Sequence, residues 1–234
     1  MLTIGLLGGM SWESSVLYEE LINTEVRSRL GGTHSADLLI KSYDFARIEA
    51  LQEDGDWDGA GELLSSDAQR LQAAGADLIV LCTNTMHRVA DVVEGAIEVP
   101  FLHLGDATAK AVLAQGLTTV GLLGTKFTMQ EDFYRQRLES HGLTVLTPSP
   151  DEQTIVHDII YNELVRGELN RSSLEEYLDI IDRLSAAGAE GVIAGCTEIE
   201  LLVSEDDVFV PFFPTTQIHA MAAVDAALGD HSTS

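Results

Sequence analysis

The residue whose type and position best suit acid–base or nucleophilic chemistry is Cys196, in the sequence Cys196-Thr-Glu198. It follows an apolar run of strand length and precedes a second apolar stretch, where a helix can begin. Backbone N–H groups at a helix start lower the pKa of a thiol, and Thr197 is suited to be the N-cap residue. A structural cysteine more often lies in the middle of a strand. The position of Cys196 therefore favours a reactive thiol.

The run Cys82-Thr-Asn-Thr-Met-His87 occupies the corresponding place in the first half of the chain. Its hydroxyls, amide and backbone N–H groups suit a bound carboxylate. Threonine and asparagine are equally suited to capping and turn formation, so both interpretations stay open. The two cysteines could also be small buried residues or form a disulfide, but a disulfide is disfavoured in a cytosolic protein.

The glycine-rich run Ile4-Gly-Leu-Leu-Gly-Gly9 is a possible phosphate-binding loop. It does not match the G-x-G-x-x-G fingerprint, and it lacks the Lys-Ser/Thr pair of a P-loop. The commoner use of glycine at such a place is a tight turn from a strand into a helix. The loop pattern therefore favours a turn over a nucleotide site.

An internal repeat sets the positions of these motifs. Ile4-Gly-Leu-Leu-Gly-Gly9 recurs as Val120-Gly-Leu-Leu-Gly-Thr125, and the segment from Ala74 to Cys82 recurs as the segment from Ala187 to Cys196. The two halves carry matching motifs in the same order and at nearly equal spacing. This pattern predicts two lobes with the same fold.

Within each half, short apolar runs alternate with amphipathic stretches. The predicted strands are residues 3–7, 38–42, 77–81, 119–123, 144–147 and 191–194. The predicted helices are residues 14–30, 58–74, 128–141, 172–187 and 216–228. Strands that alternate with helices imply right-handed βαβ crossovers and parallel sheets.

We therefore expect an α/β fold with two pseudo-symmetric Rossmann-like lobes. The first lobe comprises residues 1–106 plus 216–228, the last helix packing back on it, and the second lobe comprises residues 107–215. In such sheets ligands bind outside the carboxyl ends of the strands, which is where all the repeated motifs fall. We expect the active site between the two lobes.

The composition excludes several classes of partner. The net charge is −25, from 13 Lys and Arg against 38 Asp and Glu, so nucleic acid and anionic membranes would repel the protein. No apolar run approaches the roughly 20 residues of a membrane span. The N-terminus lacks the basic start and apolar core of a signal peptide, and we expect a cytoplasmic protein.

The acidic residues are spread along the chain, whereas the lysines are only Lys41, Lys110 and Lys126. A dispersed acidic, lysine-poor surface suggests a protein kept soluble in high salt. Activity and melting temperature that fall in molar KCl would contradict this hypothesis. An acidic surface also requires local positive groups wherever an anionic substrate binds.

Three motifs together resemble the signatures of the aspartate/glutamate racemase family: Ile4-Gly-Leu-Leu-Gly-Gly-Met10, Asn84-Thr-Met-His87 and Gly195-Cys-Thr-Glu-Ile199. Met10-Ser-Trp-Glu13, Asp44-Phe-Ala46 and Phe127-Thr-Met129 resemble its bacterial branch with broad or L-preferring activity. The resemblance covers nearly the whole chain. It implies a small acidic amino acid as substrate, no pyridoxal phosphate or other cofactor, no metal, and a homodimer.

The family implies proton abstraction on one face of the α-carbon and reprotonation on the other, usually by two cysteines. Here the sequence departs from the family, because Thr83 aligns with the first of these cysteines. Cys82 lies one residue earlier, and neighbouring side chains on a strand point to opposite faces, so we expect Cys82 to face away from the site. We therefore assign the catalytic roles to Cys196 as the base and Thr83 as the proton donor, directly or through water.

The resemblance also suggests residues that hold the substrate. Arg166 matches a lysine that binds substrate carboxylate in related aspartate racemases, and Glu198 can orient the thiol or the substrate ammonium. His87 and His219 can support the site or be structural histidines. Arg47 lies near another family arginine, but a solvated arginine at a helix start is an equal interpretation. The full substrate-binding set is Met10, Asn84, Thr85, Thr125, Thr128, Arg166, Thr197, Glu198 and Arg47.

Two other functions stay open. The fold could serve a related thiol reaction, maleate-type isomerisation or hydantoin racemisation, or the chain could be a catalytically weak relative that binds a dicarboxylate. The sequence does not distinguish aspartate from glutamate, because one methylene changes the binding free energy by only about 1–3 kcal/mol.

Overall fold

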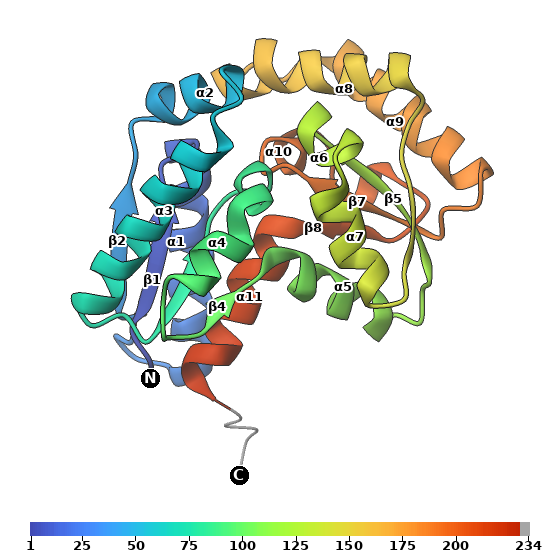
Figure 1. The fold of residues 1–234 in the computed structure, drawn as a ribbon. Coiled ribbons are helices and arrows are strands. Elements are labelled where there is room, and N and C mark those ends of the chain that lie inside the picture. Colours follow the sequence, from blue (N-terminus) through green and yellow to red (C-terminus); the bar gives the residue numbers. More distant parts are fainter. Residues whose placement is uncertain (230–234) are drawn as a thin grey trace. The chain divides into compact units, whose positions relative to one another are not determined.

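The computed structural model describes residues 1–229 and divides into two units. Among the described residues, unit 1 contains Met1–Leu104 and residues 219–229, and unit 2 contains Gly105–Ile218. Each unit contains one four-stranded sheet, in which every pair of neighbouring strands is parallel (Figure 1).

The sheet of unit 1 has the strand order β2-β1-β3-β4. Its strands are β1 (Ile4–Gly8), β2 (Leu38–Ser42), β3 (Leu78–Leu81) and β4 (Phe101–Leu102). Its helices are α1 (Trp12–Leu30), α2 (Phe45–Glu53), α3 (Trp57–Ala73), the 3-10 turn η1 (Thr85–Val89), α4 (Ala90–Gly95) and most of α11 (Thr215–Leu228).

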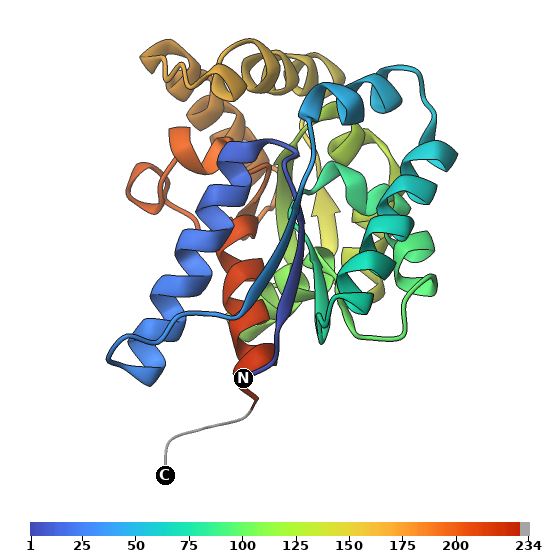
Figure 2. The same cartoon turned by 90° about the vertical axis from the view of Figure 1, so that its left-hand side faces the viewer.

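Alternation along the central strands fills both faces of this sheet. Leu6 and Val80 pack on one face against α1 and α11, which lie side by side in Figure 2. Leu7 and Ile79 pack on the other face against α2 and α3. Because both faces are covered, β1 and β3 are apolar throughout, as the central strands of a parallel sheet must be.

The sheet of unit 2 has the order β6-β5-β7-β8. Its strands are β5 (Thr119–Gly124), β6 (Thr144–Leu146), β7 (Gly191–Gly195) and β8 (Phe212–Pro214). Its helical segments are α5 (Leu104–Ala114), α6 (Lys126–Gln130), α7 (Asp132–Ser140), α8 (Pro150–Asn162), η2 (Leu164–Arg166), α9 (Arg171–Ala186), α10 (Ile199–Leu202) and η3 (Glu205–Asp207). Side chains of α8 and α9 form a single core with β5 and β7.

The two sheets have the same strand order when β1 to β4 are matched with β5 to β8. The repeated glycine motif forms β1 and β5, and the second repeated motif ends in β3 and β7. The predicted α/β architecture with two parallel sheets is confirmed. The last helix packs on unit 1 through Ala220, Ala223 and Val224.

The structure corrects the expected helices in two ways. The predicted helix 128–141 is two helices, α6 and α7, because Glu131 between them adopts an extended conformation with ψ 153°. Helices α2, α4, α5 and α8 were not predicted. A start signal for α8 was present, since Ser149 and Glu152 form a capping box around Pro150.

Among residues 1–229, no helix is both long enough and apolar enough to cross a membrane. Across the same residues, no group of three or more His, Cys, Asp or Glu side chains is arranged to hold a metal ion.

Candidate active site

The candidate residues gather at the carboxyl end of each sheet, one set per unit. In unit 1 the loop after β1 carries Met10, and the segment after β3 carries Thr83, Asn84 and Thr85. In unit 2 the carboxyl ends of β5 and β7 lead into the remaining polar set, Thr125, Thr128, Cys196, Thr197 and Glu198. Because β1 pairs with β3 and β5 pairs with β7, each set comes from two neighbouring strands.

The loop after β1 is a tight turn stabilised by its own side chains. Gly9 has φ +81°, and a Cβ atom there would lie 2.2 Å from the backbone nitrogen of Tyr43. Its N–H donates a 2.6 Å hydrogen bond to Oγ of Ser15 on α1, and Met10 is buried in the core of unit 1. The glycines therefore allow close approach of the backbone, which fits the turn interpretation of the motif.

Cys82 and Thr83 have different surroundings at the end of β3. Cys82 is fully buried and packs with Ile4, Tyr18 and Val80 in the core beneath α1 and α11. Burial raises the pKa of its thiol far above the ordinary value. Thr83 is partly exposed. The two neighbouring residues thus differ in burial, as side chains that point to opposite faces of a strand can.

The thiol of Cys196 contacts a carboxylate. Cys196 follows β7, is partly exposed, and its Sγ donates a 2.9 Å hydrogen bond to Oε2 of Glu198. Burial in the surrounding protein raises the pKa of the thiol well above its ordinary value, and the negative charge of Glu198 raises it further. The sequence-based expectation of a lowered pKa is wrong for the protein without substrate.

The reason is the local backbone. Helix α10 is only four residues long, and its N-cap residue is Glu198, which makes no side-chain capping hydrogen bond. Thr197 is therefore not the N-cap, and so short a helix offers little dipole to stabilise a thiolate. Instead the Thr197 hydroxyl accepts a 3.0 Å hydrogen bond from Oγ1 of Thr216.

Glu200 is a polar residue of this edge that the sequence did not single out. Its Oε1 accepts a 2.8 Å hydrogen bond from the backbone N–H of Thr216. The hydroxyl of the same threonine donates to the hydroxyl of Thr197. Burial raises the pKa of the Glu200 carboxyl to about 8. The available signal was a single glutamate inside the otherwise apolar stretch Ile199-Glu-Leu-Leu-Val203.

Thr125 and Thr128 interact with each other. Thr125 is the N-cap of α6; its Oγ1 accepts from the backbone N–H of Thr128 and lies 3.2 Å from the Thr128 hydroxyl. Both residues are buried. The capping interpretation of these threonines is thus realised in the structure, and substrate binding would have to use their remaining hydrogen-bonding capacity.

The two candidate arginines are both exposed. Arg47 lies in the first turn of α2, three residues after the N-cap Asp44. Arg166 ends the short turn η2, immediately before Gly167 in the left-handed conformation. Arg166 belongs to the same unit as Cys196, whereas Arg47 belongs to the same unit as Thr83.

His219 is a satisfied structural histidine. Its Nε2 lies 2.8 Å from the carbonyl oxygen of Leu102 and its Nδ1 lies 2.9 Å from the hydroxyl of Tyr18. A carbonyl only accepts, so Nε2 carries the proton and Nδ1 accepts from Tyr18. Burial lowers the pKa of His219 to about 4, which keeps the ring neutral. His87 is buried in the same unit.

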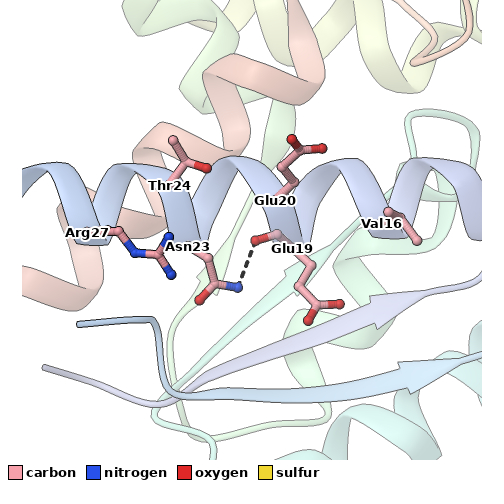
Figure 3. Close-up of a pocket in the computed structure, with 6 residues that line it drawn as sticks. All are labelled: Val16, Glu19, Glu20, Asn23, Thr24 and Arg27. Atoms are coloured by element: carbon pink, nitrogen blue, oxygen red, sulfur yellow. Dashed lines mark hydrogen bonds between the residues drawn. The ribbon is translucent and has the colours of Figure 1, made fainter. Parts of the chain in front are cut away.

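A surface hollow of about 400 Å³ lies away from this chemistry. Figure 3 shows its lining residues along one stretch of α1, with the side-chain amide of Asn23 donating to the carbonyl of Glu19. The lining consists of Val16, Glu19, Glu20, Asn23, Thr24 and Arg27. It contains none of the candidate catalytic residues.

Comparison with known proteins identifies relatives over nearly the full length. The model of the family described as Asp/Glu/Hydantoin racemase matches residues 7–223. A candidate Asp/Glu racemase of known structure from Yersinia pestis is 50% identical, with a TM-score of 0.93, over 98% of this chain and 100% of that chain.

Two further relatives are similar over comparable lengths. The structure of an aspartate racemase homologue from Pyrococcus horikoshii OT3 is 35% identical, with a TM-score of 0.87, over 98% of this chain and 100% of that chain. The broad specificity amino-acid racemase RacX of Bacillus subtilis (strain 168) is 21% identical over 234 residues, which cover 98% of this chain and 100% of its own.

Proposed function

Because the chain belongs to the Asp/Glu/hydantoin racemase family, as its motifs predicted, we propose that it racemises a small acidic amino acid, aspartate or glutamate, without a cofactor. The proposed base is Cys196 and the proposed acid is Thr83. The proposal requires the carboxyl edges of the two units to serve opposite faces of one α-carbon. This is the arrangement that inversion by two opposed groups demands.

One observation carries the assignment of the pair. At the end of β3 Cys82 is buried in the core while Thr83 is partly exposed, and at the end of β7 the partly exposed residue is Cys196. The exposed positions of the two edges thus differ chemically. Cys196 offers a thiol and Thr83 offers a hydroxyl. Because a hydroxyl is far less acidic than a thiol, Thr83 does not supply a second base equivalent to the thiolate of Cys196.

The proton balance of the proposed reaction is simple. The thiol of Cys196 first loses its proton to solvent or to the carboxylate of Glu198, with which it is already in contact. The thiolate takes the α-proton, and the hydroxyl of Thr83, directly or through water, returns a proton to the opposite face. The α-proton remains on Cys196 as its thiol proton. The proton that Cys196 first released returns through solvent to Thr83, so each group regains its starting state.

The carbanion formed beside a carboxylate needs strong electrostatic stabilisation. We propose that hydroxyl, amide and backbone N–H donors supply it, with the arginines binding the substrate carboxylates against the acidic background of the protein. The proposed donors are Met10, Asn84, Thr85, Thr125, Thr128 and Thr197, together with Arg166 and Arg47. The substrate ammonium is assigned to Glu198.

The test is α-proton exchange in D₂O, followed by NMR on each enantiomer of aspartate and glutamate, with chiral chromatography to measure inversion. We expect exchange with inversion and unequal rates for the two enantiomers. Cys196→Ala should abolish exchange, and Thr83→Ala should lower inversion by about 100-fold or more, the usual contribution of a positioned acid.

Two rival functions predict different results. A related thiol isomerase of the maleate or hydantoin type would leave the α-proton of aspartate and glutamate unexchanged while converting its own substrate. A catalytically weak relative would bind a dicarboxylate without exchange. An absence of exchange at low salt and in molar KCl would therefore rule out the racemase proposal.

We also propose that the protein acts as a homodimer in the cytoplasm and that its acidic surface is an adaptation to high salt. The net charge of −25 supports the last point. Light scattering after size exclusion tests the dimer. A melting temperature that falls on addition of molar KCl would reject the salt adaptation.

A further inference from the structure

The segment that carries Thr83 is fixed by a buried histidine of η1. The backbone N–H of Thr83 donates to the carbonyl of Leu81, and the carbonyl oxygen of Thr83 lies 2.6 Å from Nδ1 of His87. The His87 side chain is only 3% exposed. Both backbone polar groups of Thr83 therefore have defined partners, and one of these partners is a side chain.

The hydrogen bonds of His87 define its tautomer. The backbone N–H of Leu104 donates to Nε2 over 3.1 Å, so Nε2 is an acceptor. The carbonyl of Thr83 can only accept, so Nδ1 must carry the proton and donate it. His87 is thus a neutral imidazole that donates to Thr83 and accepts from Leu104.

The two anchoring points of His87 have different positions in the chain. Thr83 is the proposed acid. Leu104 is the last residue of the segment Met1–Leu104 of unit 1, and the chain enters unit 2 at Gly105. The ring of His103 packs edge-on against His87, with centroids 4.6 Å apart, and Phe101 lies 5.9 Å away. His219 holds the nearby carbonyl of Leu102, so this exit segment is held by two histidines.

We propose that His87 is a positioning residue that sets the orientation of Thr83, and so governs how efficiently a proton returns to the face of the substrate that Thr83 serves. The inference rests on the proposed racemase function. A displaced carbonyl at Thr83 rotates the Thr83 hydroxyl away from the α-carbon, and displacements of about 1 Å commonly cost about 100-fold in rate.

The proposal separates the two halves of the reaction. The hydrogen bond of the Cys196 thiol is made to Glu198, within unit 2, and His87 does not take part in it. Exchange of the α-proton by Cys196 should therefore survive when His87 is changed, while inversion should fall. A residue that only stabilised the fold would lower both rates together.

Two substitutions of His87 remove the two hydrogen bonds of its ring one at a time. The amide nitrogen of asparagine corresponds in position to Nδ1 of histidine, so His87→Asn can still donate to Thr83 while losing the acceptor for Leu104. The amide oxygen of glutamine corresponds to Nε2, so His87→Gln can still accept from Leu104 while losing the donor to Thr83. Melting temperatures of both variants establish that they are folded.

The readout is the ratio of inversion to α-proton exchange in D₂O, with Thr83→Ala as the reference for a lost acid. We expect His87→Gln to lower this ratio by about tenfold or more and His87→Asn to keep it within about threefold of the wild type. A wild-type ratio in His87→Gln, or a parallel fall of exchange and inversion in both variants, would overturn the inference while the racemase proposal stands. No exchange by the wild-type protein would defeat the racemase proposal and this inference with it.

Discussion

The thiol of Cys196 donates a 2.9 Å hydrogen bond to the carboxylate of Glu198, two residues further along the chain. Burial raises the pKa of this thiol, and the negative charge of Glu198 raises it further, because both favour the protonated form. In the protein without substrate, Cys196 is therefore a neutral thiol at neutral pH. A substrate ammonium placed beside Glu198 would cancel part of that charge and favour the thiolate.

Glu198→Gln should shift the titration of Cys196 to lower pH. Glutamine keeps an acceptor oxygen but removes the charge, so we expect the midpoint of thiol alkylation against pH to fall by about one unit or more. The rate of iodoacetamide labelling, followed by mass spectrometry, gives that midpoint. Glu205→Gln, an exposed position in η3, is the matched control and should leave it unchanged. A midpoint that stays in place or rises in Glu198→Gln would show that the carboxylate does not control the thiol.

Cys82→Ala should leave catalysis intact and cost only stability. The side chain is fully buried beneath α1 and α11, and loss of its sulfur leaves a small cavity in the core of unit 1. We expect the free energy of unfolding to fall by about 1 kcal/mol, measured by urea denaturation, with exchange and inversion close to wild type. If the folded variant were inactive, Cys82 rather than Thr83 would be the second group of the pair.

The comparison of the two cysteines shows how far the sequence predicts the site. The alternation of strands with helices and the internal repeat can be read from the sequence, so they predicted the parallel sheets. Strand alternation further predicts that Cys82 and Thr83 have different surroundings. The pKa of Cys196 was predicted in the wrong direction. It depends on the length of α10 and on the direction in which the Glu198 side chain turns, and neither is encoded in a short motif.

Residues that the sequence analysis did not single out also depend on contacts between segments and not on a local pattern. Glu200 was not singled out because its hydrogen-bond partner is Thr216, which lies in the first turn of α11 and is distant in sequence. The role of His87 likewise depends on Leu104, at the start of α5. Contacts between separate segments determine both environments, and composition and periodicity describe only single segments.

Glu200 should make the stability of the protein fall as pH rises. Burial raises the pKa of its carboxyl from 4.5 to about 8, so the folded state holds a proton that the unfolded state has released between these values. The free energy of unfolding is therefore highest below pH 4.5, the pKa of the carboxyl in the unfolded chain. It decreases as the pH rises from there and levels off above about pH 8. The substitution Glu200→Gln keeps an acceptor for the N–H of Thr216 and removes the titration.

The measurement is urea denaturation of wild type and Glu200→Gln at pH values between about 5 and 9. We expect the variant to gain at least about 1 kcal/mol relative to wild type across this range, the equivalent of one pKa unit. Glu205→Gln, at an exposed position, keeps Glu200 and should show the same dependence of stability on pH as wild type. Parallel stability curves for wild type and Glu200→Gln would mean that Glu200 is ionised in the folded protein at neutral pH.

Gly9→Ala should disrupt the turn that follows β1. The position combines φ +81° with a Cβ that would lie 2.2 Å from the nitrogen and 2.5 Å from the oxygen of Tyr43, so backbone atoms must move. Gly116 provides a matched control, because it has φ +75° but no atom within 4 Å of its Cβ position. We expect Gly116→Ala to cost about 1 kcal/mol, the ordinary penalty of the left-handed conformation.

For Gly9→Ala we expect a loss of about 3 kcal/mol or more in the free energy of unfolding, since steric overlap with backbone adds to the conformational penalty. Catalysis should fall as well, because the turn leads directly to Met10 and its Gly9 N–H is bound to Ser15. Urea denaturation and the D₂O exchange assay measure the two effects on the same samples. Equal costs for Gly9→Ala and Gly116→Ala would show that the loop can relax around a methyl group, and close approach of the backbone would then not explain the glycine at position 9.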